Sequence, residues 1–121
     1  MRKLAVLFAA CAVVLGSLTL ARSERRRRAL AGDHQGHLNV GGVDRTYILH
    51  IPESLPESGP VPLVLVFHGG GGHAATMPNF THFDSLADRE KFLVAYPESC
   101  NKSWNDTRGL SPADDVGFLR A

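Results

Sequence analysis

The sequence predicts the α/β class: an antiparallel hairpin followed by a strand, a helix and a strand in one incomplete sheet. Apolar and polar residues alternate on both sides of Gly41-Gly42, a candidate turn, up to Pro52. The runs 63–67 and 92–96 are apolar without alternation, which indicates strands covered on both faces. Because a helical segment separates these runs, the two strands should be parallel.

The helix between those strands is predicted over residues 79–91. Its apolar stripe has residues three or four apart: Phe80, Phe83, Leu86 and Ala87. Thr81 followed by Asp84 resembles a capping box, which would mark the start of the helix.

A further helix is predicted near the end of the sequence. Ser111 suits its N-cap, Pro112 its first position, and Asp114 and Asp115 its first turn. We therefore interpret the two aspartates as caps rather than as catalytic groups.

The first 21 residues have the pattern of a secretory signal. Met1-Arg2-Lys3 is basic, and residues 4–20 are almost entirely apolar. We expect cleavage after Ala21 and a secreted or periplasmic protein, without stable membrane association once the signal is removed. The arginine run 25–28 opposes translocation, so an uncleaved anchor stays open as the alternative. Residues 22–36 are expected to be a basic, polar linker and residues 37–121 the folded part.

Charge separates the two ends of the sequence. Residues 1–28 hold seven of the thirteen Lys and Arg, and the remainder has six bases against eleven acids, a net charge of −5. Neutralising phosphates requires clustered cations, so an acidic folded part excludes nucleic acid as a partner.

No metal or cofactor is expected. Cys100 would be the sole cysteine after signal cleavage, which allows neither a disulfide framework nor a zinc site. His68 and His73 have no third ligand at a recognisable spacing, so we interpret them as structural or loop-anchoring residues. His50 is expected to be a half-exposed strand residue.

The chemically informative feature is the strand 63–67 that runs directly into His68 and the glycines 69–72. Glycine lets backbone N–H groups approach a ligand closely. Ligands of open α/β sheets bind beyond the carboxyl ends of the strands, where this loop is expected. A phosphate-binding loop would need Lys and Ser or Thr after the glycines, whereas His73-Ala74-Ala75 follows here.

Five blocks in order then resemble the polyhydroxybutyrate depolymerase and feruloyl esterase family: residues 42–52, residues 62–72, Ala95-Tyr96-Pro97, Ser103-Trp104-Asn105-Asp106 and residues 114–119. The resemblance covers the sequence from about Gly36 onward. It implies the N-terminal portion of a secreted α/β-hydrolase of the polyhydroxyalkanoate depolymerase, feruloyl esterase or acetyl esterase type. The substrates would be carboxylic esters of a polyester or of plant cell walls.

The resemblance assigns roles to particular residues. His68, Gly69, Gly70 and Gly71 match the oxyanion loop, and Trp104 and Asn105 match a block at the substrate rim. No Gly-x-Ser-x-Gly occurs, so the serine, acid and histidine of the triad are expected beyond Ala121, and residues 1–121 alone should be inactive. A non-catalytic, secreted or membrane-anchored binding protein of hydrolase ancestry is the alternative.

Overall fold

The computed structural model describes residues 19, 21–26, 28–106 and 111–121. The chain divides into two units, Met1–Leu30 and Ala31–Ala121. In the first unit, residues 21–26 and 28 are helical and exposed, where the sequence predicted a linker without structure. Alanine, arginine and glutamate are good helix formers even without an apolar stripe, which explains the difference. Apart from Thr19 and Ala21, the predicted signal segment lies outside the described residues.

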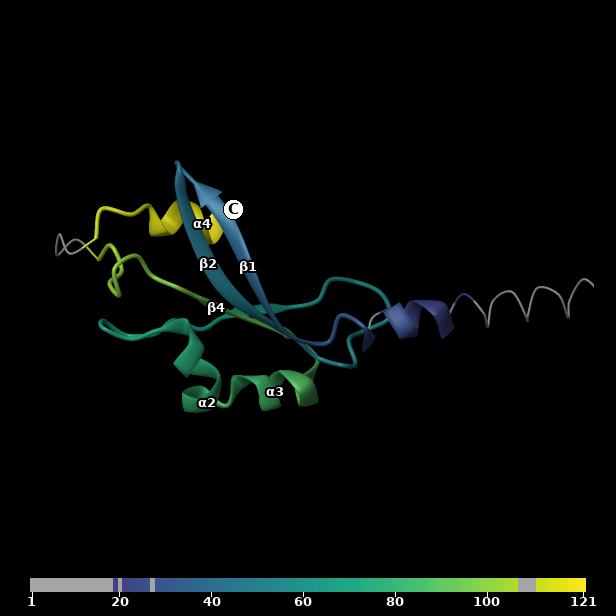
Figure 1. The fold of residues 1–121 in the computed structure, drawn as a ribbon. Coiled ribbons are helices and arrows are strands. Elements are labelled where there is room, and N and C mark those ends of the chain that lie inside the picture. Colours follow the sequence, from purple (N-terminus) through teal and green to yellow (C-terminus); the bar gives the residue numbers. More distant parts are fainter. Residues whose placement is uncertain (1–18, 20, 27, 107–110) are drawn as a thin grey trace, which may run out of the picture. The chain divides into compact units, whose positions relative to one another are not determined.

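The second unit is built on a four-stranded sheet with the order β1-β2-β4-β3 (Figure 1). Strands β1 (Gly32–Val40) and β2 (Val43–Ile51) form the predicted antiparallel hairpin. Gly41 and Gly42 have φ of 59° and 84°, the left-handed pair that a two-residue type I′ turn requires. Strand β1 begins at Gly32, five residues before the predicted start, because backbone pairing with β2 continues there without apolar residues.

The remaining strands confirm the predicted βαβ order. Strand β3 (Leu63–Leu65) is parallel to β4 (Leu93–Pro97), and β4 is antiparallel to β2. Segments far apart in the sequence thereby become neighbours in one incomplete sheet, and the carboxyl ends of β3 and β4 lie at the same edge.

Two short helices replace the single helix predicted over residues 79–91. After the 3-10 helix η1 (Ala74–Thr76), α2 (Met77–Thr81) ends at His82, which has φ of 57°, and α3 (Phe83–Glu90) follows.

The predicted capping box does not form, because its hydroxyl and its carboxylate each have another partner. The Thr81 hydroxyl donates to the Met77 carbonyl, and Asp84 accepts a hydrogen bond from Tyr96. Phe80, predicted on the buried stripe, is 82% exposed.

Helix α4 (Asp115–Arg120) begins later than predicted. Asp114 is its N-cap and accepts a hydrogen bond from the Gly117 N–H at 2.8 Å, which confirms the capping role for that residue. The interpretation of Asp115 as a second cap is wrong. Its carboxylate is buried and lies 2.6 Å from the guanidinium of Arg45, so β2 and α4 are joined by an ion pair that no sequence pattern indicated.

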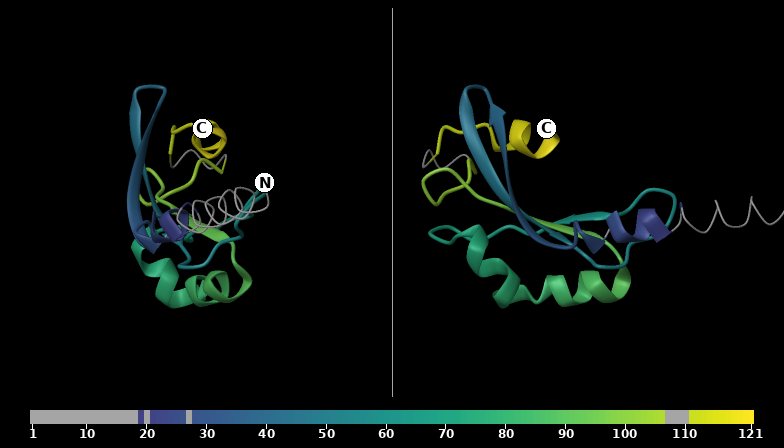
Figure 2. Two further views of the ribbon diagram at one scale, coloured as in Figure 1. Left: turned by 90° about the vertical axis from the view of Figure 1, so that its right-hand side faces the viewer. Right: turned by 45° about the vertical axis from the view of Figure 1, so that its right-hand side comes forward.

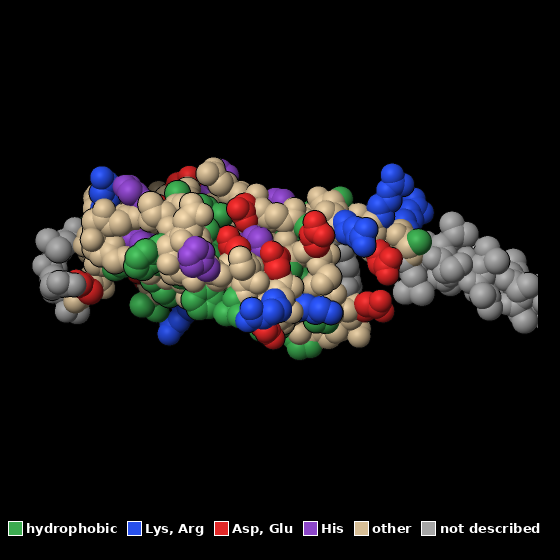
Figure 3. All heavy atoms as spheres, turned by 90° about the horizontal axis from the view of Figure 1, so that it is seen from below, with side chains coloured by type: hydrophobic (Ala, Val, Ile, Leu, Met, Phe, Trp, Pro, Cys, Tyr) green, Lys and Arg blue, Asp and Glu red, His purple; other side chains and the backbone are tan. Residues whose placement is uncertain are grey.

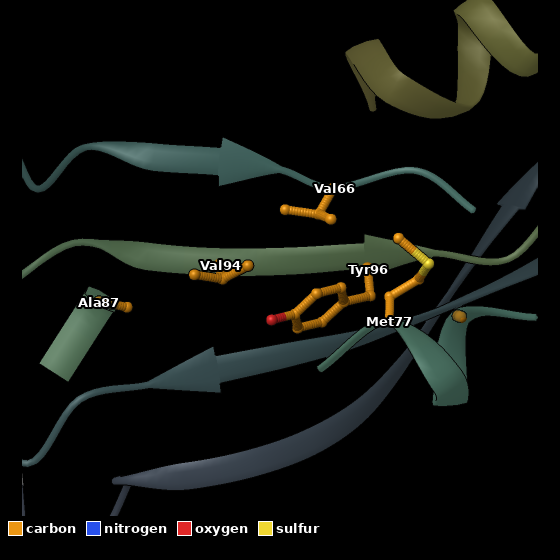
Figure 4. Close-up of a cluster of buried hydrophobic side chains, with 6 residues drawn as sticks. Val66, Met77, Ala87, Val94 and Tyr96 are labelled. Carbon is orange, nitrogen blue, oxygen red and sulfur yellow. The ribbon is translucent and has the colours of Figure 1, made fainter. Parts of the chain in front are cut away.

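Helices α2 and α3 cover one face of the sheet, as Figure 2 shows from two further directions. The core lies between them and the sheet, and its largest member is Tyr96 of β4 (Figure 4). It consists of Val66, Ala74, Met77, Ala87, Val94 and Tyr96. Since side chains alternate along strands, β2 presents Ile48 and His50 to this face and Arg45 and Tyr47 to the other.

The second face is largely uncovered in the described part of the chain. Helix α4 packs near Arg45, with the guanidinium 4.3 Å from the centre of the Phe118 ring. Leu63, Leu65 and Phe67 remain 53%, 38% and 42% exposed. The prediction that the run 63–67 is covered on both faces is therefore wrong within this structure, where only Val64 and Val66 face the core side.

Candidate oxyanion loop

The glycine loop leaves the sheet at the carboxyl end of β3. The ladder continues one step beyond the strand, where the Val66 N–H donates to the Ala95 carbonyl at 2.9 Å. The chain then turns outward at His68, which is buried, while Gly69 and Gly70 are exposed. The loop thus lies at the sheet edge where the sequence predicted it.

Two of the loop N–H groups are already used. The Gly71 N–H donates to the Lys102 carbonyl at 2.8 Å, and the Gly72 N–H donates to the Gly69 carbonyl at 3.0 Å. Gly71 has φ of 77°, a conformation that strongly favours glycine. Gly71 therefore shapes the loop, but its N–H cannot donate to a ligand without breaking a bond.

The N–H groups of Gly69 and Gly70 have no hydrogen-bond partner within the described part of the chain. Each of these N–H groups shares a peptide with a carbonyl that already accepts a hydrogen bond. The Trp104 Nε1–H donates to the His68 carbonyl at 2.8 Å, and the Nδ1 of His68 lies 2.8 Å from the Gly69 carbonyl oxygen. Because a peptide is planar with its C=O and N–H pointing in opposite directions, these bonds orient the two open N–H groups.

His68 anchors the loop, as the sequence analysis expected. Its Nε2 lies 3.0 Å from Glu98 Oε1, while Nδ1 faces the Gly69 carbonyl. The Gly69 carbonyl accepts only, so Nδ1 donates to it, and the Ser99 N–H lies 3.3 Å from Nε2. Glu98 Oε2 accepts a hydrogen bond from the Ala74 N–H at 2.9 Å, which fixes the chain beyond the glycines.

Trp104, predicted at a substrate rim, packs beside the loop. Its ring lies 5.0 Å from that of His68 and meets Phe67 edge-on at 5.3 Å, measured between ring centres. Asn105 is tied to the neighbouring segment instead: its backbone N–H donates to Asp115 and its side chain to the Ala113 carbonyl.

A second polar cluster surrounds His50, and the prediction that His50 is half-exposed is wrong. Its Nδ1 lies 2.7 Å from Asp33 of β1, and its Nε2 lies 3.1 Å from Asp88 of α3. Asp84 is close to the same ring and accepts from the Tyr96 hydroxyl at 2.6 Å. Acidic and histidine side chains are seen together on the face that carries α2 and α3 (Figure 3).

These surroundings set the protonation of two groups. Burial alone would lower the pKa of His50, but hydrogen bonds to Asp33 and Asp88 and the charge of Asp84 raise it above its ordinary value of 6.5. Burial raises the pKa of the Tyr96 hydroxyl, and its bond to Asp84 adds to the increase.

One group of potential metal ligands exists among the described residues. Asp33, His50 and Asp84 each offer one ligand atom, and the three atoms lie within 4.8 Å of one another. Both nitrogens of His50 face carboxylates, however, so an ion-paired, protonated histidine already accounts for this arrangement.

Sequence reasoning missed Glu98 and Arg45. Glu98 follows the Ala95-Tyr96-Pro97 block, and its position directly after a buried strand was the available signal. Arg45 is a charged residue within an alternating strand, where it would ordinarily be exposed, and it is 2% exposed.

Comparison with solved structures defines the class of fold. The chain is similar to S-formylglutathione hydrolase FrmB from Staphylococcus aureus, with a TM-score of 0.55, 16% identity, and coverage of 74% of this chain and 39% of that one. The chain thus has the α/β-hydrolase fold and forms part of such a sheet. No family model matches the sequence.

A curated relative extends the likeness to sequence. NocK of Nocardia uniformis subsp. tsuyamanensis, which is named as a candidate esterase, is 36% identical over 107 residues, covering 81% of this chain. The chain spans 30% of the length of that relative.

Two further findings concern the described part of the chain. Within the described residues, no helix is both long and apolar enough to cross a membrane. Cys100 is a free, partly buried thiol.

Proposed function

We propose that this chain supplies the oxyanion-binding part of the active site of a secreted serine carboxylesterase. The observation that carries the proposal is the pair of adjacent, unengaged N–H groups of Gly69 and Gly70, held by tied carbonyls at the carboxyl edge of the sheet. Likeness to NocK and to a hydrolase fold supports the same chemistry.

In the proposed reaction, a serine outside residues 1–121 attacks the carbonyl carbon of an ester. The π electrons move onto the carbonyl oxygen, and the N–H groups of Gly69 and Gly70 donate to that oxyanion. The triad histidine takes the serine proton during the attack and gives it to the alkoxide, which leaves as the C=O bond re-forms. Water then attacks the acyl-enzyme by the same steps, which releases the acid and restores the serine. Each well-aimed donor of this kind contributes on the order of 3 to 4 kcal/mol to the transition state.

Polyhydroxybutyrate depolymerase or feruloyl esterase activity is the proposed subtype, and the five sequence blocks support it. The substrates would be a polyester or a plant cell-wall ester. The basic start and apolar segment of residues 1–21 support secretion, with cleavage after Ala21.

The test uses the protein that contains residues 1–121 together with its nucleophile, here named the whole enzyme. It should react with a fluorophosphonate probe and hydrolyse p-nitrophenyl butyrate, whereas residues 1–121 alone should do neither. Rates on methyl ferulate and on hydroxybutyrate oligomers then separate the subtypes. A folded whole protein that neither reacts nor hydrolyses any of these esters would favour the non-catalytic binding protein.

Secretion has a separate test. N-terminal sequencing of the exported protein should start after Ala21. Recovery of intact Met1 in the membrane fraction would favour the uncleaved anchor.

A further inference from the structure

Glu98 lies outside the glycine loop, yet its carboxylate contacts residues on both sides of it. Oε1 lies 3.0 Å from the Nε2 of His68, before the glycines, and Oε2 accepts from the Ala74 N–H, after them. We propose that Glu98 and Trp104 are positioning residues that aim the two oxyanion donors. This inference rests on the proposed function of the loop.

The path from Glu98 to a donor has two steps. The Glu98 carboxylate lies 3.0 Å from Nε2 of the His68 ring, a nitrogen that the Ser99 N–H also approaches at 3.3 Å. Nδ1 of the same ring holds the Gly69 carbonyl at 2.8 Å. The Gly69 carbonyl shares a peptide plane with the Gly70 N–H, so the ring angle sets the direction of that N–H. Glu98 therefore acts on the Gly70 donor through the His68 ring, alongside the hydrogen bond that the Gly72 N–H donates to the same carbonyl.

Trp104 controls the neighbouring donor directly. Its Nε1–H donates to the His68 carbonyl, which shares a peptide plane with the Gly69 N–H. Trp104 thus acts on the peptide between His68 and Gly69, and Glu98 acts, through the His68 ring, on the next peptide along the chain.

A carboxylate is required at position 98 because donors approach from two directions. Besides His68 and Ala74, the Ser99 N–H lies 3.2 Å from Oε1. The His73 Nδ1 lies 3.7 Å from Oε2. Glutamine would place its NH₂ group against one of these donors, and charge-assisted hydrogen bonds are about twice as strong as neutral ones.

The experiment compares Glu98→Gln and Trp104→Phe in the whole enzyme. Phenylalanine keeps an aromatic ring against Phe67 and removes only the donor, and Glu90→Gln, an exposed carboxylate paired with Arg89, is the matched control. Each test variant should lower kcat about 10- to 100-fold, which is less than the loss caused by deleting an oxyanion donor outright. KM should change less than about twofold. The control should retain wild-type kcat.

Two readouts separate aiming from general structural support. A trifluoromethyl ketone, which forms a tetrahedral oxyanion with the enzyme, should bind more weakly by the same factor as kcat/KM falls. In amide NMR spectra, the Gly70 peak should shift mainly in Glu98→Gln and the Gly69 peak mainly in Trp104→Phe.

Specific results would overturn the inference. Unchanged Gly69 and Gly70 amide peaks in both variants would do so whether or not the wild-type enzyme hydrolyses esters. The inference would also be overturned if both variants were folded and active and bound the ketone as tightly as the wild type does. An inactive wild-type enzyme with shifted glycine peaks would count against the proposed function, while the positioning role would stand.

Discussion

Two buried histidines lie at opposite ends of the parallel strands, and their surroundings differ in one respect. His50, level with Val94 near the start of β4, has carboxylates at both nitrogens and ties β1, β2 and α3 together. His68, beyond the end of β3, uses one nitrogen to hold a backbone carbonyl. Both ring nitrogens of His50 are paired, whereas beside His68 the N–H groups of Gly69 and Gly70 have no partner among the described residues.

The difference shows that burial and charge pairing do not by themselves mark a functional site. In the His50 cluster the carboxylates raise the pKa of the histidine, yet both nitrogens of its ring are already paired with those carboxylates. The His68 cluster is recognised by the N–H groups of Gly69 and Gly70 beside it, which have no hydrogen-bond partner among the described residues. We therefore expect changes near His68 to alter catalysis, and changes near His50 to alter stability alone.

The largest loss of stability is expected from Arg45→Met, because this buried arginine of β2 joins Glu98 to Asp115. Arg45 donates to Asp115 and to the Glu98 carbonyl, so its removal leaves a buried carboxylate unpaired. Breaking such a buried pair costs about 3 to 5 kcal/mol. Urea unfolding of the whole enzyme measures the change.

A double variant, Arg45→Met with Asp115→Asn, serves as the control. It should recover part of the lost free energy of unfolding, because the remaining residue is no longer charged. A double variant no more stable than the single one would show that packing against Phe118, rather than charge, is what Arg45 contributes.

A smaller loss, about 1 to 3 kcal/mol, is expected from His50→Gln, which removes hydrogen bonds to charged partners. Because the folded pKa of His50 is raised, its contribution is fully present below pH 6.5, the ordinary value, and is lost as pH rises through the folded pKa. The groups that face the ring are Asp33, Asp84 and Asp88. Unfolding free energies of the wild type and the variant should therefore converge at alkaline pH.

The same variant tests the comparison between the clusters. The kcat of His50→Gln should equal that of the wild type at a temperature where both are folded. A reduced kcat under those conditions would mean that the His50 cluster does act on the site.

Gly71→Ala is expected to cost about 1 to 2 kcal/mol, because alanine disfavours a left-handed backbone conformation. The φ of Gly71 is 77°, whereas Gly70 has an ordinary φ and open space around an added Cβ. Thermal unfolding should therefore distinguish Gly71→Ala from Gly70→Ala, which should melt like the wild type. Equal melting temperatures for all three proteins would contradict the loop geometry.

The smallest effect is expected at the exposed end of α3. Arg89→Gln removes an exposed ion pair with Glu90, and such pairs contribute about 0 to 1 kcal/mol. High salt should remove whatever difference remains between the variant and the wild type in urea unfolding. A larger loss that persists in salt would show that the end of α3 carries an additional interaction.

Several elements followed from local patterns. Alternation with Gly41-Gly42 predicted the hairpin, and two apolar runs around a helical segment predicted the parallel pair. The strand running into glycines indicated where backbone N–H groups would leave the sheet. The helix break at His82 was not predictable, because the apolar spacing continues through a residue whose backbone is left-handed.

The sequence by itself determined the fold class, the succession of strands along the chain and the position of the glycine loop, since each depends on residue types a few positions apart. Only the tertiary structure decided which loop N–H groups are open and which side chains hold them. Those contacts join residues such as His68 to Glu98 and Arg45 to Asp115, which are distant in the chain. Hydrogen bonds between them depend on register and burial, and neither has a periodic signature in the sequence.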